Sequence, residues 1–250
     1  MKLDFTGQRV LVTGATRGIG AAIAAAFEER GASLVLTGTN QREIEDLNRQ
    51  NDDAGRSHVR WLQADFSSAS STESLVGKIS EMPPFHVLIN NAGTNRINLI
   101  DEIHTDDVDL LLSINLRAPL LLCKAVSRGM KEMQYGRIVN IASIWSVITK
   151  PGRTVYAATK TGLAGMTRSV AVDLASQGIL VNAVSPGFVE TELTRASLSP
   201  EERENLAAQV PVRRFAAPDE IARIVLFLSS SLNSYLTGQN IVVDGGFSCI

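Results

Sequence analysis

Cysteine is rare in this chain of 250 residues, and neither sign of charge is in clear excess. The two cysteines, Cys123 and Cys249, are too few for a disulfide framework and too far apart in the sequence for a zinc knuckle, which is typical of a reducing compartment. The 24 Lys and Arg residues nearly balance the 26 Asp and Glu residues. The resulting net charge of −2 disfavours nucleic acid and anionic membranes as partners.

An uninterrupted apolar segment of signal-peptide or membrane-spanning length is also missing. The first ten residues are of mixed polarity, and the most apolar later segment, LRAPLLLCKAV, contains Arg117 and Lys124. We therefore expect a soluble, cytoplasmic protein that does not enter a membrane. The three histidines, His58, His86 and His104, have no Cys, Asp or Glu at metal-ligand spacing, so we expect no metal site.

Short apolar runs alternate with longer amphipathic segments along the whole chain. Runs rich in Val, Ile and Leu predict seven strands, at 9–13, 33–37, 59–63, 86–90, 136–143, 179–185 and 240–244. Helices are predicted between them, near 18–30, 41–50, 70–81, 105–133, 155–176 and 218–231. The alternation predicts a single Rossmann-type α/β domain over 1–250, with a doubly wound, seven-stranded parallel sheet and helices on both faces.

One segment, at about 187–218, breaks the alternation. It is long and polar, and it contains a helical stretch of its own that begins with Ser199 as a predicted N-cap and Pro200 at the first helical position. Long excursions of this kind inside a compact domain often close over a ligand, so we predict a substrate lid there.

A glycine-rich turn, TGATRGIG, directly follows the first predicted strand. It places Gly14, Gly18 and Gly20 where that strand meets the first helix. Glycine permits a tight turn and a close approach of the backbone to a pyrophosphate, and the helix amino end offers free N–H groups to the anion. An ordinary turn of an α/β protein is the alternative, but the position after the first strand favours a dinucleotide site.

Together with the NNAG segment at 90–93, the turn resembles that of the short-chain dehydrogenase/reductase family. Further markers of the family stand in order along the chain: Asp65, Asn115, Ser143, Tyr156, Lys160, Pro186 and Gly187, Thr191, and IVVDGG at 241–246. Within the family the chain is most similar to the 3-oxoacyl-(acyl-carrier-protein) reductases. The resemblance implies that a dinucleotide contacts Gly14, Thr16, Arg17, Gly18, Ile19, Gly20, Thr39, Asp65, Phe66, Asn91, Ala92, Gly93, Tyr156, Lys160, Pro186, Gly187, Val189 and Thr191.

The end of the second predicted strand indicates which dinucleotide is preferred. The segment 31–42, GASLVLTGTNQR, contains no Asp or Glu, whereas NAD-preferring folds carry a carboxylate about 20 residues past the glycines. Arg17 and Arg42 would instead place two positive charges beside a 2′-phosphate. We therefore predict NADP(H) as the preferred cofactor and leave NAD(H) open, since Thr39 stands where NADP-preferring relatives often carry Arg.

Tyr156 and Lys160 lie four residues apart on a predicted helix, so they project from one face. Hydride transfer at a secondary alcohol requires a proton to move at the carbinol oxygen, and a phenol can carry it if a nearby cation lowers its pKa, ordinarily about 10. Ser143 lies at the carboxyl end of the fifth strand, where parallel sheets bind ligands. The resemblance implies that Ser143 polarises the substrate oxygen, Lys160 also holds the nicotinamide ribose, and Asn115 anchors a proton-relaying water.

Pro119 lies four residues after Asn115 in the predicted helix 105–133. Because proline has no N–H, it cannot bond to the Asn115 carbonyl, so we expect a kink there and a carbonyl free to accept from water or Lys160. A tolerated bend without function is the alternative.

The sequence leaves the substrate open. A 3-oxoacyl thioester is the first candidate, but Gln134 and Gln177 stand where the resemblance implies arginines that dock acyl carrier protein. Trp145 and Arg153 are predicted to line the substrate pocket together with Ser143 and Tyr156, with Arg153 available to a carboxylate or a hydroxyl-rich group. Ordinary packing and a solvated charge are the alternatives for these two side chains.

Two other functions therefore stay open beside thioester reduction. A small oxo-acid, sugar or polyol derivative is one substrate class, and a catalytically silent dinucleotide sensor is a different kind of protein. The sensor would have no need of the serine, tyrosine and lysine together. The helix predicted at 155–176 is rich in small residues, and relatives assemble through this helix, so we expect a homotetramer.

Overall fold

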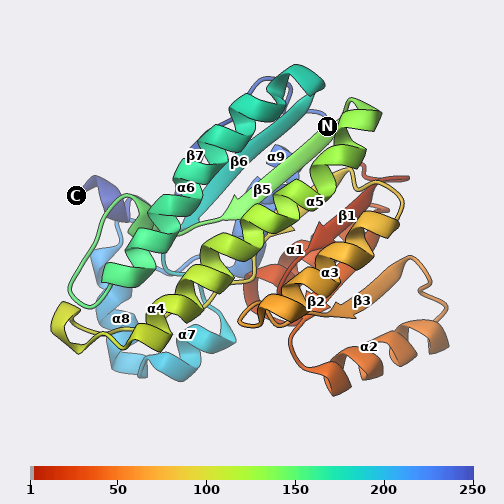
Figure 1. Ribbon diagram of the computed structural model, residues 1–250. Coiled ribbons are helices and arrows are strands. Elements are labelled where there is room, and N and C mark those ends of the chain that lie inside the picture. The colour runs from red at the N-terminus through yellow and green to blue at the C-terminus, as the bar shows by residue number, and fades with distance from the viewer. Residues whose placement is uncertain (1–2) are drawn as a thin grey trace.

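Seven parallel strands form one sheet with helices against both of its faces (Figure 1). The computed structural model describes residues 3–250, without the side chains of Leu193 and Ser197. The strands are β1 Arg9–Val12, β2 Ser33–Gly38, β3 Val59–Gln63, β4 Val87–Asn90, β5 Gly136–Ile141, β6 Ile179–Pro186 and β7 Asn240–Val243. Their order in the sheet is β3-β2-β1-β4-β5-β6-β7, and every neighbouring pair is parallel, which confirms the predicted fold class.

Both faces of the sheet are buried, as expected for strands that are apolar along their whole length. Val10 and Val12 of β1 belong to one hydrophobic cluster, whereas Leu11 between them belongs to a second. The first cluster includes residues of α1 Gly18–Glu28 and α9 Pro218–Ser229. The second includes residues of α3 Ala69–Glu81, α5 Ala118–Met133 and α6 Thr154–Leu174, while α2 Gln41–Asp53 packs beside β3 at the sheet edge.

The helix predicted over 105–133 is not regular. It consists of α4 Thr105–Leu112, a π-helical turn at Ser113–Arg117, and α5, with the Ala118 N–H bonded to the Ser113 carbonyl. Pro119 lies in the first turn of α5, so the predicted irregularity is present and takes the form of this π turn. By length and composition alone the run Thr105–Met133 could cross a membrane, a property that it shares with helices that pack in a protein core.

The chain leaves β1 toward β2 and β3 and returns to pair β4 with the other side of β1. This reversal places the carboxyl ends of β1 and β4 side by side, at the point where parallel sheets bind ligands. The segment 187–218 contains α7 Glu192–Ser197 and α8 Pro200–Gln209. The predicted cap is confirmed, since the Ser199 hydroxyl accepts a hydrogen bond from the Glu202 N–H at 3.1 Å and Glu202 bonds back.

Candidate functional site

The turn after β1 is fixed by hydrogen bonds to the first residues after β4. Thr13 Oγ1 accepts from the backbone N–H groups of Asn91 and Ala92 at 3.0 Å, and the Asn91 amide donates to the carbonyls of Thr13 and Gly14 at 2.9 Å. Gly14 has a φ of +62°, and a Cβ at Gly20 would lie 2.2 Å from the Gly14 carbonyl oxygen, so both positions require glycine. Two predicted cofactor segments thus meet here. The sequence analysis did not single out Thr13, although a hydroxyl at the end of an otherwise apolar strand is a signal.

No side chain caps the amino end of α1. Arg17 occupies the N-cap position with an extended backbone, makes no capping hydrogen bond and is exposed. The next helix differs, since Asn40 Oδ1 accepts from the backbone N–H groups of Arg42 and Glu43 at 3.0 and 3.2 Å. Free N–H groups and the positive end of the helix dipole make the start of α1 suited to a phosphate group.

The end of β2 lies against the glycine turn. A Cβ at Gly38 would lie 2.6 Å from Thr16 Cγ2, so the two segments are in contact. Thr39 follows at an exposed position, and Arg42 is exposed in the first turn of α2. Glu43, the nearest acid, lies inside that helix as expected. The strand end therefore carries no carboxylate for a ribose 2′-hydroxyl.

Asp65 and Phe66 follow β3 at the same edge of the sheet. Asp65 Oδ1 accepts from the Ser67 N–H at 2.9 Å and from the Ser67 hydroxyl at 2.6 Å, which closes a local turn. The Phe66 side chain is buried in the hydrophobic cluster that contains Leu62 and Leu75. Phe66 is therefore able to face a ligand only through its backbone.

The segment after β6 reaches the glycine turn. The predicted residues there are Pro186, Gly187, Val189 and Thr191. Thr191 caps α7, its hydroxyl accepting from the Thr194 N–H at 3.2 Å. A Cβ on Gly18 would lie 3.4 Å from Thr191 Cγ2, so the start of the predicted lid touches the turn after β1.

Ser143, Tyr156 and Lys160 converge beyond the end of β5. The Ser143 hydroxyl accepts from the backbone N–H of Trp145 at 3.3 Å and lies close enough to the Tyr156 phenol to lower its pKa. Lys160 Nζ lies 5.7 Å from the centre of the Tyr156 ring and donates to the Ile141 carbonyl oxygen at 2.8 Å. Helix α6 thus carries the phenol and the ammonium on the face that meets the end of β5.

Burial dominates the protonation of both groups on α6. Lys160 is 3 % exposed, and burial lowers its pKa to about 8. Burial raises the pKa of Tyr156, while the hydrogen bond with Ser143 and the charge of Arg153 act in the opposite direction. We expected the Lys160 ammonium to favour the phenolate. In this structure Arg153 is the cation that lowers the phenol's pKa, and Lys160 bonds to a backbone carbonyl.

Asn115 is fully buried in the π turn and ties down the loop after β4. Its Oδ1 accepts from the Thr94 N–H at 2.9 Å, and its amide donates to the Thr94 carbonyl at 2.9 Å and to Thr159 Oγ1 at 3.2 Å. A Cβ at Gly93 would lie 3.4 Å from both Asn115 Oδ1 and Lys160 Nζ, so these three predicted residues meet. Thr94 and Thr159 were not among the predicted site residues, although Thr159 directly precedes Lys160.

Trp145 and Arg153, which are predicted to line a substrate pocket, lie together beside Ser143 and Tyr156. Trp145 is 8 % exposed, and the Arg153 guanidinium lies 5.4 Å from the centre of its ring. Lys150 Nζ lies 5.5 Å from the same ring, a second cation that the sequence analysis missed. Arg153 Nε is buried and has no hydrogen-bond partner. The two cations are thus held by an aromatic face.

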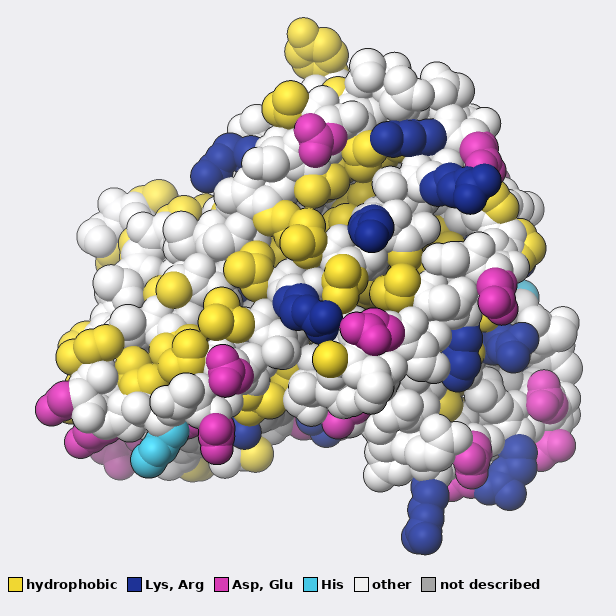
Figure 2. Space-filling view, viewed as in Figure 1, with side chains coloured by type: hydrophobic (Ala, Val, Ile, Leu, Met, Phe, Trp, Pro, Cys, Tyr) yellow, Lys and Arg dark blue, Asp and Glu magenta, His cyan; other side chains and the backbone are white. Residues whose placement is uncertain are grey.

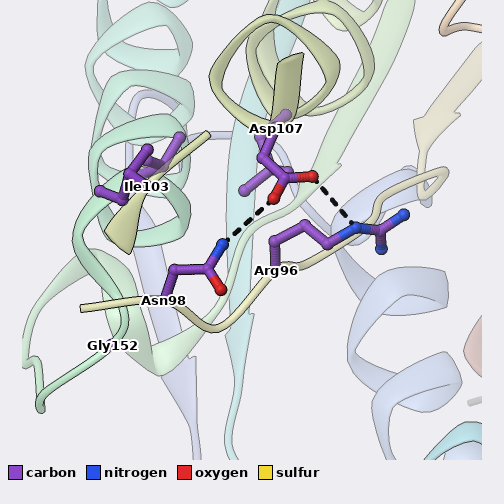
Figure 3. A pocket seen from close by; sticks show the side chains of 7 residues that line it. Arg96, Asn98, Ile103, Asp107 and Gly152 are labelled. Carbon is purple, nitrogen blue, oxygen red and sulfur yellow. Dashed lines mark hydrogen bonds and ion pairs between the residues drawn. The ribbon is translucent and has the colours of Figure 1, made fainter. Parts of the chain in front are cut away.

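A hollow adjoins these residues between the loop after β4, α4 and the start of α6 (Figure 3). Its lining residues are Arg96, Asn98, Ile103, Asp107, Leu111, Gly152 and Val155. Asp107 accepts from Asn98 at 3.1 Å and pairs with Arg96 Nε at 3.3 Å, so the arginine on this wall has a carboxylate partner.

Within residues 3–250, no group of three or more His, Cys, Asp and Glu side chains is arranged to hold a metal ion. His86 Nδ1 accepts from the Arg9 N–H at 3.0 Å, and His58 contacts Glu28 at 3.1 Å. These two histidines therefore have partners within the protein.

Comparisons with known proteins cover almost the whole chain. A family model described as enoyl-(acyl carrier protein) reductase matches residues 14–248. The 3-oxoacyl-(acyl-carrier-protein) reductase FabG of Escherichia coli is 38% identical over 245 residues, which are 98% of each chain. The corresponding reductase of Vibrio cholerae is 37% identical over 249 residues, 99% of this chain and 100% of its own.

Solved structures give a second set of relatives. A gluconate 5-dehydrogenase from Burkholderia cenocepacia in complex with NADP and tartrate superposes with a TM-score of 0.91 at 30% identity, over 99% of this chain and 98% of that one. A short chain dehydrogenase/reductase family protein superposes with a TM-score of 0.87 at 35% identity, over 98% of this chain and 99% of that one. The relatives therefore differ in the kind of substrate that their names give.

Proposed function

The chain belongs to the short-chain dehydrogenase/reductase family of oxidoreductases, and from that premise we propose that it interconverts a ketone and a secondary alcohol with NADP(H). The observation that carries the proposal is the meeting of Ser143, Tyr156 and Lys160 at the end of β5. A sensor that only binds a dinucleotide has no use for this group. We further propose that residues 1–250 act as one dinucleotide-binding domain; a cytoplasmic location stays a prediction from the sequence.

The residues present fit a dinucleotide with a 2′-phosphate. The uncapped start of α1 suits a pyrophosphate, and the glycine turn leaves backbone, not side chains, beside it. In the part of the chain that the structure describes, neither Arg17 nor Arg42 has a carboxylate partner, so both are free to meet a phosphate. These features favour NADP(H) over NAD(H), and the Burkholderia cenocepacia relative holds NADP.

In the proposed mechanism Tyr156 moves the proton at the carbinol oxygen while Ser143 donates a hydrogen bond to the same oxygen. The bound dinucleotide supplies or accepts the hydride. The positive charge of Arg153 lowers the cost of the phenolate, and Lys160 would add to this effect where it would hold the ribose of the dinucleotide. Asn115 fixes the loop that contains Gly93, which lies beside Lys160.

Two substrate classes remain in this proposal. The curated relatives favour a 3-oxoacyl thioester, whereas the gluconate 5-dehydrogenase relative favours a small oxo-acid, sugar or polyol derivative. At the expected docking surface Gln134 donates to Gln177 at 3.0 Å, so a neutral pair stands where an acidic carrier protein needs positive charge. Trp145 and Arg153 beside Tyr156 also suit a small polar molecule.

We also propose a homotetramer, with the lid of 187–218 closing over each site. Figure 2 shows apolar side chains gathered over α5 and α6 on one face of the molecule. Leu112 of α4, Leu120 of α5 and Val172 of α6 are 41%, 49% and 80% exposed, and a partner subunit would cover them. Light scattering at micromolar concentration tests this, and a monomeric mass would contradict it.

The function is tested by following NADPH and NADH oxidation with a panel of carbonyl compounds. The panel contains acetoacetyl thioester without carrier protein, short oxo-acids and keto sugars. We expect carbonyl-dependent oxidation of NADPH, at a kcat/KM at least about tenfold above that with NADH. NADH lacks the 2′-phosphate, and charged hydrogen bonds between that phosphate and arginine contribute about 1.5–3 kcal/mol to binding. Equal use of the two nucleotides would overturn the cofactor preference.

A further inference from the structure

We propose that Arg153 binds the carboxylate of a small oxo-acid or hydroxy-acid substrate, with Lys150 beside it, so that the enzyme selects acids over neutral ketones. The inference rests on the proposed function and names the substrate class of that same site. Arg153 is a specificity-determining residue in this proposal, while the chemical step stays with Tyr156 and Ser143.

The two cations are built into the wall of the site. The Arg153 guanidinium and Lys150 Nζ lie 5.4 and 5.5 Å from the centre of the Trp145 ring. The backbone N–H of Trp145 donates to the Ser143 hydroxyl at 3.3 Å, so the residue whose ring contacts both cations is bonded to Ser143 through its backbone. A ligand bound at Ser143 would therefore lie near the positive charges of Arg153 and Lys150.

These charges have no counter-ion among the side chains that the structure describes. In the described residues 3–250, no carboxylate forms an ion pair with Arg153 or Lys150. Burial lowers the pKa of both side chains, and the charge of Arg153 lowers that of Lys150 further, as expected for neighbouring cations that lack an anion. The site is thus positive before a substrate arrives.

One hydrogen-bond donor at the site has no partner in the part of the chain that the structure describes. Arg153 Nε is buried without a partner, although buried polar groups are nearly always hydrogen-bonded. Nε together with a terminal nitrogen forms the fork that binds both oxygens of a carboxylate. Arg96 in the neighbouring loop differs, because its Nε already pairs with Asp107 at 3.3 Å (Figure 3). The missing acceptor of Arg153 is therefore assigned to the substrate.

The place of Arg153 at the start of α6 limits the size of the acid. Arg153 is the N-cap residue of α6 and lies three residues before Tyr156. The charge of Arg153 acts on the phenol, which places the two groups close together. A carboxylate here belongs to the same small molecule as the reacting carbonyl. The phosphate of a long thioester arm would lie much farther from that carbonyl.

The test compares short oxo-acids with their primary amides, which have the same shape and no charge, using NADPH. Acetoacetate and acetoacetamide form one such pair. The proteins are the wild type, Arg153→Gln, Arg153→Lys and Arg96→Gln, the last as a matched arginine from the adjoining loop. A second readout is competitive inhibition by tartrate and by its diamide, measured with whichever carbonyl compound is turned over.

We expect the wild type to prefer acid over amide by at least about tenfold in kcat/KM, because charged hydrogen bonds contribute this much or more. Arg153→Gln lowers kcat/KM for the acid about tenfold to a hundredfold, chiefly through KM, and weakens inhibition by tartrate equally. The amide changes less than about threefold, Arg153→Lys retains part of the preference, and Arg96→Gln leaves the acid-to-amide ratio unchanged.

Equal kcat/KM for acid and amide in the wild type would overturn the inference while NADPH-dependent reduction of neutral ketones or thioesters upheld the proposed function. An equal fall for acid and amide in Arg153→Gln would also overturn it, since the residue would then be structural. If no carbonyl compound is reduced by the wild type, the proposed function fails, and the inference fails with it.

Discussion

The turn after β1 is fixed by hydrogen bonds to the loop after β4, whereas on the substrate side the buried Nε of Arg153 has no acceptor among the described residues. Thr13 and Asn91 take part in four hydrogen bonds that join the turn after β1 to the loop after β4. Such bonds contribute about 0.5–1.5 kcal/mol each, so this side is rigid before a ligand arrives. Arg153 Nε, by contrast, is left without a partner. The difference indicates a preformed dinucleotide site beside a substrate site that an anion completes.

The largest effect on turnover is expected at Tyr156, which lies between the cofactor side and the substrate side. Tyr156→Phe removes the proton-carrying oxygen and should lower kcat about 10²- to 10⁴-fold while NADP+ binding stays within about threefold of the wild type. Steady-state kinetics and a calorimetric titration measure the two quantities. A variant with wild-type turnover would show that the proton moves elsewhere.

The pH dependence of stability tests the burial of Lys160. Its pKa of about 8 lies below the ordinary value near 10.4, so between these pH values the unfolded chain binds a proton that the folded protein releases. The contribution of Lys160 to the free energy of unfolding therefore rises with pH across this window, by about 3 kcal/mol in all.

Urea unfolding of the wild type and Lys160→Met between pH 7.5 and pH 10 isolates this contribution. The difference in free energy of unfolding between the two proteins should shift in favour of the wild type as the pH rises. A difference that stays flat over this range would mean that Lys160 keeps its ordinary pKa.

Crowding at the glycine turn gives a smaller effect with a matched control. A Cβ in Gly20→Ala would lie 2.2 Å from the Gly14 carbonyl and 2.5 Å from Asn91 Nδ2, so the free energy of unfolding should fall by about 1–3 kcal/mol and NADP+ affinity with it. Gly77 in α3 has nothing within 4 Å, and Gly77→Ala should stabilise the helix by about 0.5–1 kcal/mol. Thermal unfolding of both variants checks the contrast, and equal melting temperatures would refute the close packing.

The smallest effect is expected in the predicted lid. Glu190 accepts from Arg195 of α7 at 2.8 Å and from Arg203 of α8 at 3.0 Å. Because these pairs lie at the surface, Glu190→Gln should change the free energy of unfolding by less than about 1 kcal/mol, as measured by urea unfolding. A loss above about 2 kcal/mol would mean that the two helices belong to the core fold and not to a lid.

The sequence predicted the parts of the molecule that depend on regular patterns. The seven strands, the helix of 199–209 and the face shared by Tyr156 and Lys160 follow from apolar runs, capping residues and helical spacing. The glycine turn was recognisable because its position after the first strand is meaningful in itself. These features are local, so a single chain contains the information for them.

Contacts between distant segments were harder to predict. These contacts join residues that are remote in the sequence or lie on irregular loops. They are the hydrogen bonds of Thr13, the bond from Asn115 to Thr159, and the contact of Lys150 with the Trp145 ring. The π turn was anticipated only as a kink at Pro119, because the sequence does not reveal which carbonyl is skipped.

The central claim is tested most directly by a single turnover. The protein is loaded with NADPH, mixed rapidly with a short oxo-acid, and the bound NADPH is followed by its absorbance, beside Tyr156→Phe as a control. The account predicts a fast decay of bound NADPH in the wild type that is at least about a hundredfold slower in the variant. Bound NADPH that persists in the wild type with every carbonyl compound of the panel would contradict it, and would leave a protein that holds the dinucleotide without using it.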